Sequence, residues 1–305
     1  MLKLIASRSC LTTLRLARTL SIKKTGVRSS SLHTTPAIQR EGLGDFALTD
    51  RVAIVTGGNR GLGLEAALAL SVAGSRAVYC LDLPEKPGED WNAARQIVEK
   101  LGGAGRLEYV TADVCDQKRL LKTVEDIATK EGRMDICVAA AGTTGIPRHV
   151  LEYTEEDLEK VYAVNIKGVF FSAQAAAKQI ARFQLPGSIV LVASIAGSVA
   201  LRDPPMMPYH TSKAAVIQMA RSMACELAQK NIRVNSLSPG FIETPLLTPL
   251  FSAQPEFRAV WSEQNLMKRL GKPHELRGVV TWLASDASSY CTGSNIVVDG
   301  GHTAL

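Results

Sequence analysis

The chain has 305 residues, of which 46% are hydrophobic and 21% charged, enough apolar sequence for one large α/β domain or two smaller ones. Its formal net charge of +6 arises in the first 40 residues, which contain eight Lys and Arg residues and no acidic residue. The rest of the chain holds 27 basic and 29 acidic side chains and is close to neutral. This balance argues against nucleic acid as a partner.

The first 40 residues also contain twelve Ser and Thr residues, and leucines recur there at roughly helical spacing. A basic, hydroxyl-rich and amphipathic segment without acids is typical of an organelle transit peptide. We therefore expect residues 1–42 to be a mitochondrial transit peptide and linker, cleaved between residues 28 and 42, with the mature protein in the matrix. The alternative is a basic tail with no targeting role. The segment has no uncharged apolar run long enough for a secretory signal or a membrane span.

The six cysteines and five histidines are scattered and show no paired metal-ligand spacing. Cys80 and Cys137 lie within apolar runs, where a thiol behaves as a small hydrophobic side chain. We expect no catalytic metal.

From about residue 45, short apolar runs alternate with longer helical segments. The runs predict strands over residues 51–56, 77–81, 107–111, 136–140, 188–192, 233–237 and 295–298. The segments between them predict helices over residues 61–73, 89–101, 116–131, 154–184, 208–229 and 273–285. This alternation predicts one α/β domain with a doubly wound parallel sheet and helices on both faces. The stretch 241–275, with four prolines, predicts an excursion over a pocket.

A glycine-rich turn follows the first expected strand, in the sequence Thr56-Gly57-Gly58-Asn59-Arg60-Gly61-Leu62-Gly63. Glycines at this place let the backbone approach a pyrophosphate, which the next helix faces with its N-terminus. The spacing differs from the commoner G-x-G-x-x-G fingerprint, so a tight turn without a ligand is the alternative. As candidate cofactor contacts we take Gly57, Asn59, Arg60, Gly61, Leu62 and Gly63.

Two acidic residues follow the second and third strands. Asp82 lies 19 residues after Gly63, where a carboxylate bonds the adenosine ribose and repels a 2′-phosphate. NAD(H) is therefore favoured, although Arg60 and Lys86 leave NADP(H) possible. Asp113 is a candidate for the adenine amino group, or for the cap of the next helix.

Tyr209 and Lys213 are four residues apart, so both side chains leave the same face of a helix. A free phenol has a pKa of about 10, and a nearby ammonium favours the phenolate. The pair predicts a general acid/base beside a dinucleotide, with Lys213 lowering the pKa of Tyr209. Taken alone, such a pair is more often a half-buried tyrosine and a solvated lysine.

Together and in this order, these residues resemble the short-chain dehydrogenase/reductase family over about residues 48–301. Further matching motifs are Asp113-Val114, Asn165, Ser194-x-x-Gly197, Pro239-Gly240 with Thr244, and the ending Thr292-Gly293 followed by Val298-Asp299-Gly300-Gly301. The resemblance implies a Rossmann-fold dehydrogenase domain over residues 43–305, including a substrate loop over 241–275. It also implies a homo-oligomer, a tetramer or a dimer, with the helices 154–184 and 208–229 at its interfaces.

The resemblance implies a role for each matching residue. Tyr209 would be the acid/base, supported by Lys213; Ser194 would bond the substrate oxygen, and Asn165 would hold a water that links Lys213 to solvent. The remaining cofactor contacts would be Val114, Ala140, Ala141, Gly142, Pro239, Gly240, Ile242 and Thr244. One departure is that the family's Asn-Asn-Ala-Gly reads Ala139-Ala140-Ala141-Gly142 here. The lost amides predict a cost of about 1 kcal/mol per missing hydrogen bond.

The segment 203–208 before Tyr209 is expected to line the substrate site. The length of chain between Ser194 and Tyr209 is similar to that in fungal polyol and ketose reductases of the family. We therefore expect an NAD(P)(H)-dependent enzyme that interconverts a secondary alcohol and a ketone, with an arabinitol-like polyol or sugar as substrate. Ile195, Met206, Met207 and Leu246 would make part of the wall apolar, which suits a 3-oxoacyl or hydrophobic-ketone reductase. From other classes, an inactive dinucleotide-binding scaffold and a targeted structural subunit stay open.

Overall fold

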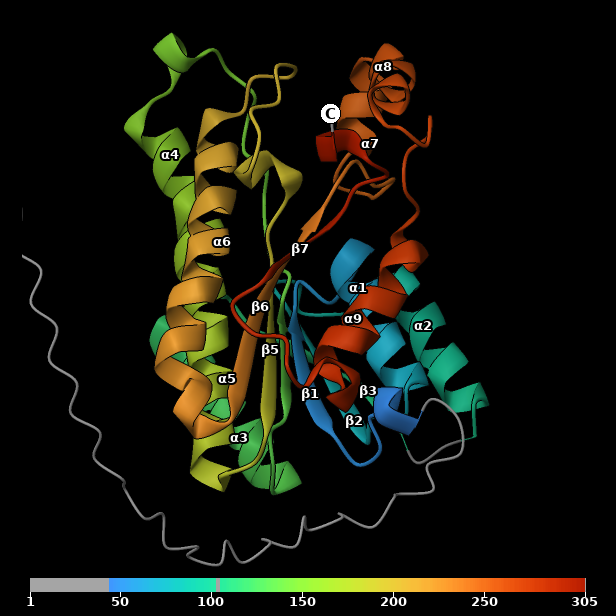
Figure 1. Ribbon diagram of the computed structural model, residues 1–305, viewed down its shortest axis with the longest axis vertical. Helices are drawn as coiled ribbons and strands as arrows, with labels where there is room; N and C mark the ends of the chain where they lie inside the picture. The colour runs from blue at the N-terminus through green and yellow to red at the C-terminus, as the bar shows by residue number, and fades with distance from the viewer. Residues whose placement is uncertain (1–43, 103–104, 305) are drawn as a thin grey trace, which may run out of the picture. The chain divides into compact units, whose positions relative to one another are not determined.

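The computed structural model of the chain describes residues 44–102 and 105–304. The transit peptide predicted over residues 1–42 lies outside these ranges. The described residues form a seven-stranded sheet in the order β3-β2-β1-β4-β5-β6-β7, and all neighbouring pairs are parallel (Figure 1). Its strands are β1 (Val52–Thr56), β2 (Ala77–Asp82), β3 (Arg106–Thr111), β4 (Ile136–Ala139), β5 (Gly187–Val192), β6 (Ile232–Pro239) and β7 (Asn295–Val298).

Burial explains why the central strands are apolar along their whole length. Every residue of β1 and β4 is buried, as expected for strands that are covered on both faces. β1 pairs with β2 on one side and with β4 on the other. Strands β1 to β3 therefore extend the sheet in one direction and strands β4 to β7 in the other, with the switch between β1 and β4. In open α/β sheets, ligands bind outside the carboxyl ends of the strands at such a switch point.

Helices cover both faces of the sheet (Figure 1). One face carries α1 (Gly61–Val72), α2 (Glu89–Lys100) and α9 (Arg277–Ala284), which pack over one buried apolar cluster. The other carries α3 (Gln117–Glu131), α5 (Val169–Phe183) and α6 (Met207–Leu227) over a second cluster, and α4 (Glu155–Tyr162) packs against α6. The predicted doubly wound fold is confirmed.

The helix expected over 154–184 is interrupted. It begins at a capping box made by Thr154 and Asp157, but a π-helical turn, Ala163–Gly168, separates α4 from α5. A π-turn inserts one extra residue and redirects the side chains around it. Here the redirected region contains Asn165, which is fully buried. The predicted helical stretch is thus present over nearly its whole length, and the π-turn within it is the feature that the sequence did not indicate.

The stretch 241–275 is more ordered than the predicted excursion. It contains α7 (Thr248–Ala253) and α8 (Glu256–Gln264), the latter preceded by Pro255. Proline fits a helix's first turn, where its missing N–H is not needed, so the prolines mark helix starts as well as loops. The two helices cover a third apolar cluster, built on Phe241, Trp261 and Leu270. Among the described residues, no helix is both long and apolar enough to cross a membrane.

Candidate active site

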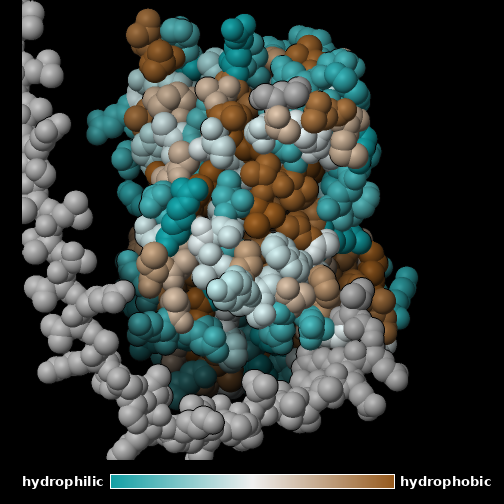
Figure 2. Space-filling model, in the orientation of Figure 1, coloured by the Kyte–Doolittle hydropathy of each residue, from teal (hydrophilic) through white to brown (hydrophobic). Residues whose placement is uncertain are grey.

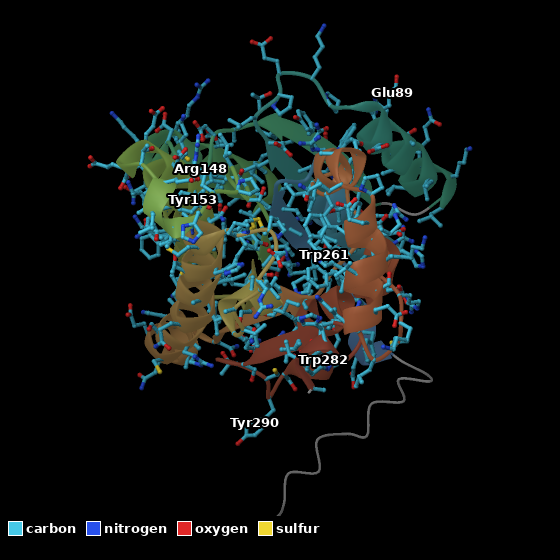
Figure 3. The ribbon with its side chains drawn as sticks, turned by 90° about the horizontal axis from the view of Figure 1, so that it is seen from above. Glu89, Arg148, Tyr153, Trp261, Trp282 and Tyr290 are labelled. Carbon is cyan, nitrogen blue, oxygen red and sulfur yellow. The ribbon has the colours of Figure 1, made fainter. Side chains whose placement is uncertain are left out.

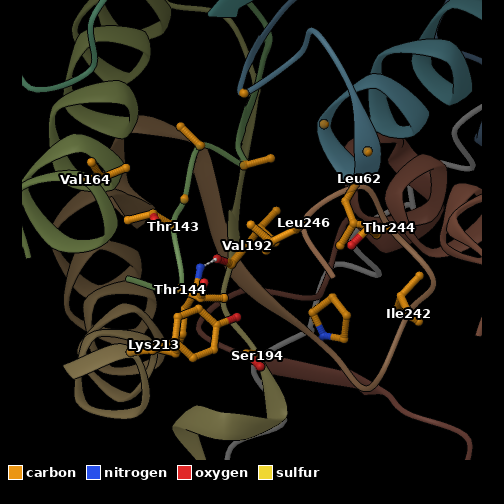
Figure 4. A pocket seen from close by; sticks show the side chains of 18 of the residues that line it. Leu62, Thr143, Thr144, Val164, Val192, Ser194, Lys213, Ile242, Thr244 and Leu246 are labelled. Carbon is orange, nitrogen blue, oxygen red and sulfur yellow. Dashed lines mark hydrogen bonds between the residues drawn. The ribbon is translucent and has the colours of Figure 1, made fainter. Parts of the chain in front are cut away.

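A cavity of about 470 Å³ lies at the carboxyl ends of the strands (Figure 4). The turns that follow six of the strands, β1 to β6, contribute to its wall, as does α6. Of the predicted site residues it brings together Gly57, Arg60, Gly61, Leu62, Gly63, Asp82, Asp113, Val114, Ala140, Ala141, Gly142, Ser194, Tyr209, Lys213, Pro239, Gly240, Ile242 and Thr244. Asn59 and Asn165 lie behind this wall, and each of them positions residues that belong to it.

Close backbone approaches at the turn after β1 leave no room for a side chain at Gly57 and Gly63. Gly57 has φ +70°, and a Cβ there would lie 2.8 Å from backbone atoms of Ala141. A Cβ on Gly63 would lie 2.1 Å from the carbonyl oxygen of Gly57. The helix α1 then begins at Gly61 with no side-chain cap and no acid in its first turn. Its first N–H groups therefore suit the pyrophosphate of a dinucleotide.

Asp82 ends β2 with its carboxylate held at the cavity. One carboxylate oxygen accepts from the backbone N–H of Asn59 at 3.0 Å, and the other from that of Leu83 at 2.8 Å. Asn59 is itself fixed, because its side-chain oxygen accepts from the N–H of Gly88 at 2.8 Å. Asn59 thus orients the carboxylate through its main chain.

Asp113 lines the cavity after β3, and its carboxylate accepts from the N–H of Cys115 at 2.8 Å. It does not cap the following helix. That role belongs to Asp116, whose carboxylate accepts from the N–H of Arg119 at 3.0 Å. Asp113 is therefore placed at the cavity by a local turn.

Tyr209 and Lys213 leave the same face of α6, with the Lys213 ammonium 5.6 Å from the centre of the Tyr209 ring. The ammonium donates to the carbonyl oxygen of Val192 at 2.8 Å, drawn as a dashed line in Figure 4. Lys213 is only 4% exposed, and burial lowers its pKa to about 8. The lysine is thus held at the end of β5 with its charge poorly solvated.

The pKa of Tyr209 is raised in the protein alone, because burial disfavours the phenolate more than the hydrogen bond with Ser194 favours it. The sequence predicted a lowered value through Lys213, and that prediction was wrong for the protein alone. The lysine's distance and its bond to Val192 leave desolvation as the dominant effect. A tyrosine in this state is a proton donor at neutral pH.

Ser194 follows β5 at the start of a 3-10 turn, Ile195–Gly197. Its hydroxyl oxygen accepts from the N–H of Ala196 at 3.1 Å. This contact uses an oxygen lone pair and leaves the O–H free to donate, so Ser194 can donate toward a substrate oxygen or Tyr209.

Asn165 connects three elements. Its amide NH₂ donates to the carbonyl of Thr143 at 2.9 Å and to the hydroxyl of Ser212 at 3.0 Å. Its amide oxygen accepts from the N–H of Thr143 at 2.9 Å. Asn165 therefore braces the chain just after Ala139-Ala140-Ala141-Gly142, where the amides common in the family are missing.

Several cavity residues were not predicted from the sequence. The hydroxyl residues Thr143 and Thr144 line it directly after Gly142, a position that could have indicated them. The further unpredicted lining residues are Leu83, Ala112, Val164, Val192, Ala193, Leu201, Phe241, Pro245, Leu247 and Trp261. Of the predicted apolar wall, Ile195, Met206 and Leu246 line the cavity. Met207 does not, because it starts α6 and its sulfur lies 4.0 Å from the hydroxyl of Thr211.

Comparison with known proteins identifies the group to which the chain belongs. The sequence profile of the family described as "Enoyl-(Acyl carrier protein) reductase" matches residues 57–303. A D-arabinitol 2-dehydrogenase [ribulose-forming] of Candida tropicalis is 34% identical over 84% of this chain and 94% of its own length. The sorbose reductase sou1 of Schizosaccharomyces pombe is 36% identical over 84% of this chain and 97% of its own.

Solved structures with a similar fold belong to the same kind of protein as these sequence relatives. A short-chain type dehydrogenase/reductase from Mycobacterium marinum superimposes with a TM-score of 0.80 at 34% identity, covering 86% of this chain and 99% of its own. A gluconate 5-dehydrogenase from Burkholderia cenocepacia J2315, in complex with NADP and tartrate, has a TM-score of 0.77 at 29% identity, covering 86% and 98% of the two chains. The chain belongs to the short-chain dehydrogenase/reductase family of NAD(P)-dependent oxidoreductases, and its relatives named for arabinitol and sorbose act on CH–OH groups.

Proposed function

We propose that the chain interconverts a secondary alcohol and a ketone, with Tyr209 as the proton donor and acceptor. The observation that carries this is the convergence of Tyr209, Ser194 and Lys213 in one cavity with the glycine turn. A nicotinamide cofactor supplies or accepts the hydride when it is bound. An idle scaffold would have no reason to keep these three side chains together.

In ketone reduction the site acts by donating a proton to the carbonyl oxygen. Tyr209, with its raised pKa, keeps its proton until it transfers it to the carbonyl oxygen. Ser194 donates to the same oxygen as negative charge develops on it. Lys213 would hold the ribose of a bound cofactor, and Asn165 fixes the backbone of Thr143, which lines the same cavity. A water that Asn165 holds must use its remaining amide lone pair or its main-chain carbonyl, because both amide hydrogens are donated within the protein.

A polyol–ketose pair is the proposed substrate. Two relatives with over 30% identity are named for arabinitol and sorbose. The hydroxyls of Thr143, Thr144 and Ser194 line the cavity and suit a substrate with several hydroxyl groups. We expect protein starting near residue 42 to oxidise D-arabinitol and to reduce ribulose or sorbose. Absorbance of NADH and NADPH measures this, and turnover restricted to apolar ketones would contradict the polyol assignment.

A 3-oxoacyl or hydrophobic ketone is the second candidate, and the apolar part of the wall favours it. Leu201, Met206, Leu247 and Trp261 line the cavity and offer mainly carbon surface. A C–H-rich substituent packs against such a wall without losing hydrogen bonds to water. The same absorbance assay with 2-alkanones and 3-oxoacyl esters separates the two candidates.

NAD(H) is the proposed cofactor, on the strength of the fixed Asp82 carboxylate. Its position is set by Asn59 and Leu83, so a 2′-phosphate would meet a negative charge that cannot easily turn away. Arg60 at the same cavity and the NADP found with two solved relatives are the opposing observations.

We therefore expect Asp82→Ala to shift the ratio of kcat/KM for NAD over NADP toward NADP by about tenfold, since one such charge contact is worth about 1.4 kcal/mol. Steady-state rates with both cofactors measure the ratio. Asp113→Ala is the matched control, because it removes the other carboxylate of this end of the cavity and should weaken both cofactors alike. An unchanged ratio in Asp82→Ala would assign the selectivity to another group.

We also propose a homo-oligomer in the mitochondrial matrix. The basic, acid-free and hydroxyl-rich composition of residues 1–40 supports the mitochondrial location. The edge strand β7 supports assembly, since Val297 is 40% exposed and apolar side chains gather on the face along which β7 runs (Figure 2). Tyr290 stands clear of the same side of the molecule (Figure 3). Light scattering of the purified protein and imaging of a fusion to residues 1–42 test the two statements.

A further inference from the structure

One part of the cavity wall is lined by apolar and aromatic side chains. We call it the distal wall, and it consists of Leu201, Met206, Phe241, Leu246, Leu247 and Trp261. Leu201 and Met206 belong to the segment between Ser194 and Tyr209, so this wall adjoins the reacting groups. The other four members follow β6, the strand that pairs with β5, which carries Ser194 at its end.

Trp261 has a special place in the distal wall because it comes from the helix that covers the cavity. It is the one described residue of α8 that lines the cavity, and it is only 2% exposed. Its ring stacks on Phe241 with centroids 4.2 Å apart and planes 12° apart. Seen from above, it lies over the middle of the molecule, between the helices of the two faces (Figure 3).

The indole is held from behind by two rings that do not line the cavity. Phe251 packs edge-on at 5.6 Å and Phe257 lies tilted at 5.5 Å. Arg258 lies over Phe251 and also pairs with Glu243, whose other oxygen pairs with Lys272. With neighbours on these sides, the ring has little freedom to turn away when a substrate arrives.

We propose that Trp261 is a specificity-determining residue that sets the size limit for the substituent on one side of the reacting carbon. The substituent enters the space between Ser194 and the distal wall and ends against the indole. The inference rests on the proposed function, because it takes Ser194 and Tyr209 as the place of reaction.

The test compares substrate series of graded length in the wild-type protein and in two variants. Reduction of 2-alkanones with four to ten carbons and of 2-ketoses with four to six carbons is followed with NADH and with NADPH. Each methylene beyond a rigid limit costs about tenfold or more in kcat/KM. We expect Trp261→Leu to move the length limit of the accepted series upward by two or more carbons, and Trp261→Phe to move it less.

Phe257→Leu is the matched control. It removes a ring from the same aromatic cluster on the side away from the cavity. The variant therefore weakens the packing around Trp261 without enlarging the cavity. An equal shift in Phe257→Leu, or an unshifted length profile in Trp261→Phe and Trp261→Leu, would overturn the role of Trp261. Wild-type protein that binds NADH but reduces no member of either series would instead overturn the proposed function, and the inference with it.

Discussion

Replacing Tyr209 by phenylalanine is expected to lower kcat by about a hundredfold or more, because a positioned general acid contributes about 10²–10⁴ to the rate. The substitution removes the phenolic oxygen alone and keeps the ring on α6 beside Lys213. Binding of NADH should stay nearly unchanged, because the glycine turn, Asp82 and Lys213 are untouched. Turnover by absorbance and NADH binding by fluorescence measure the two quantities separately.

Tyr162→Phe provides the matched control. Its phenol also lies against α6, at 2.9 Å from the hydroxyl of Thr211, but it does not line the cavity. The same atom is thus removed from the same neighbourhood, and activity should stay near that of the wild type. If Tyr209→Phe retained more than a few per cent of the activity, or lost NADH binding together with turnover, the acid/base role would fail.

The fold was predictable because each level of the sequence pointed to the same architecture. The largely apolar run at β1 indicates a strand buried on both faces, and the structure shows it between β2 and β4. The features that the sequence did not indicate are those that tertiary contacts decide. The π-turn around Asn165 exists where a buried amide bonds the main chain of Thr143, 22 residues away. No local pattern contains that information.

The site was predictable where chemistry depends on local spacing, and not where it depends on segments that meet in space. The glycine turn and the Tyr209–Lys213 pair are short patterns, and both line the cavity. Their catalytic roles stay predictions. Trp261 reaches the cavity only because α8 folds back over the strand ends and stacks on Phe241. The raised pKa of Tyr209 likewise comes from burial, which a four-residue spacing cannot reveal.

Lys213→Met is expected to abolish turnover and, at the same time, to stabilise the fold. Burial lowers the pKa of Lys213 to about 8 from an ordinary value of 10.5. Below pH 8 the lysine is charged in both the folded and the unfolded chain, so folding carries the full cost of desolvating it, roughly 3 kcal/mol at about 1.4 per pH unit. The variant also loses the hydrogen bond to Val192, which lowers its stability by about 1 kcal/mol. The net increase in the free energy of unfolding is therefore about 2 kcal/mol at pH 7.

The difference in stability between Lys213→Met and the wild type should depend on pH. Between pH 8 and 10.5 the folded chain releases the Lys213 proton before the unfolded chain does, so wild-type stability gains with rising pH relative to the variant. The Tm of Lys213→Met should therefore exceed that of the wild type by about 5 °C at pH 7, and the gap should narrow as the pH rises above 8. Thermal unfolding from pH 6 to 9 measures this. Lys167→Met, at a position that is 56% exposed, should show no comparable gap. A gap that widens with pH, or a variant less stable than the wild type at pH 7, would show that Lys213 is not held in the folded protein at a desolvation cost. In that case its bond to Val192 would outweigh the cost of burying its charge.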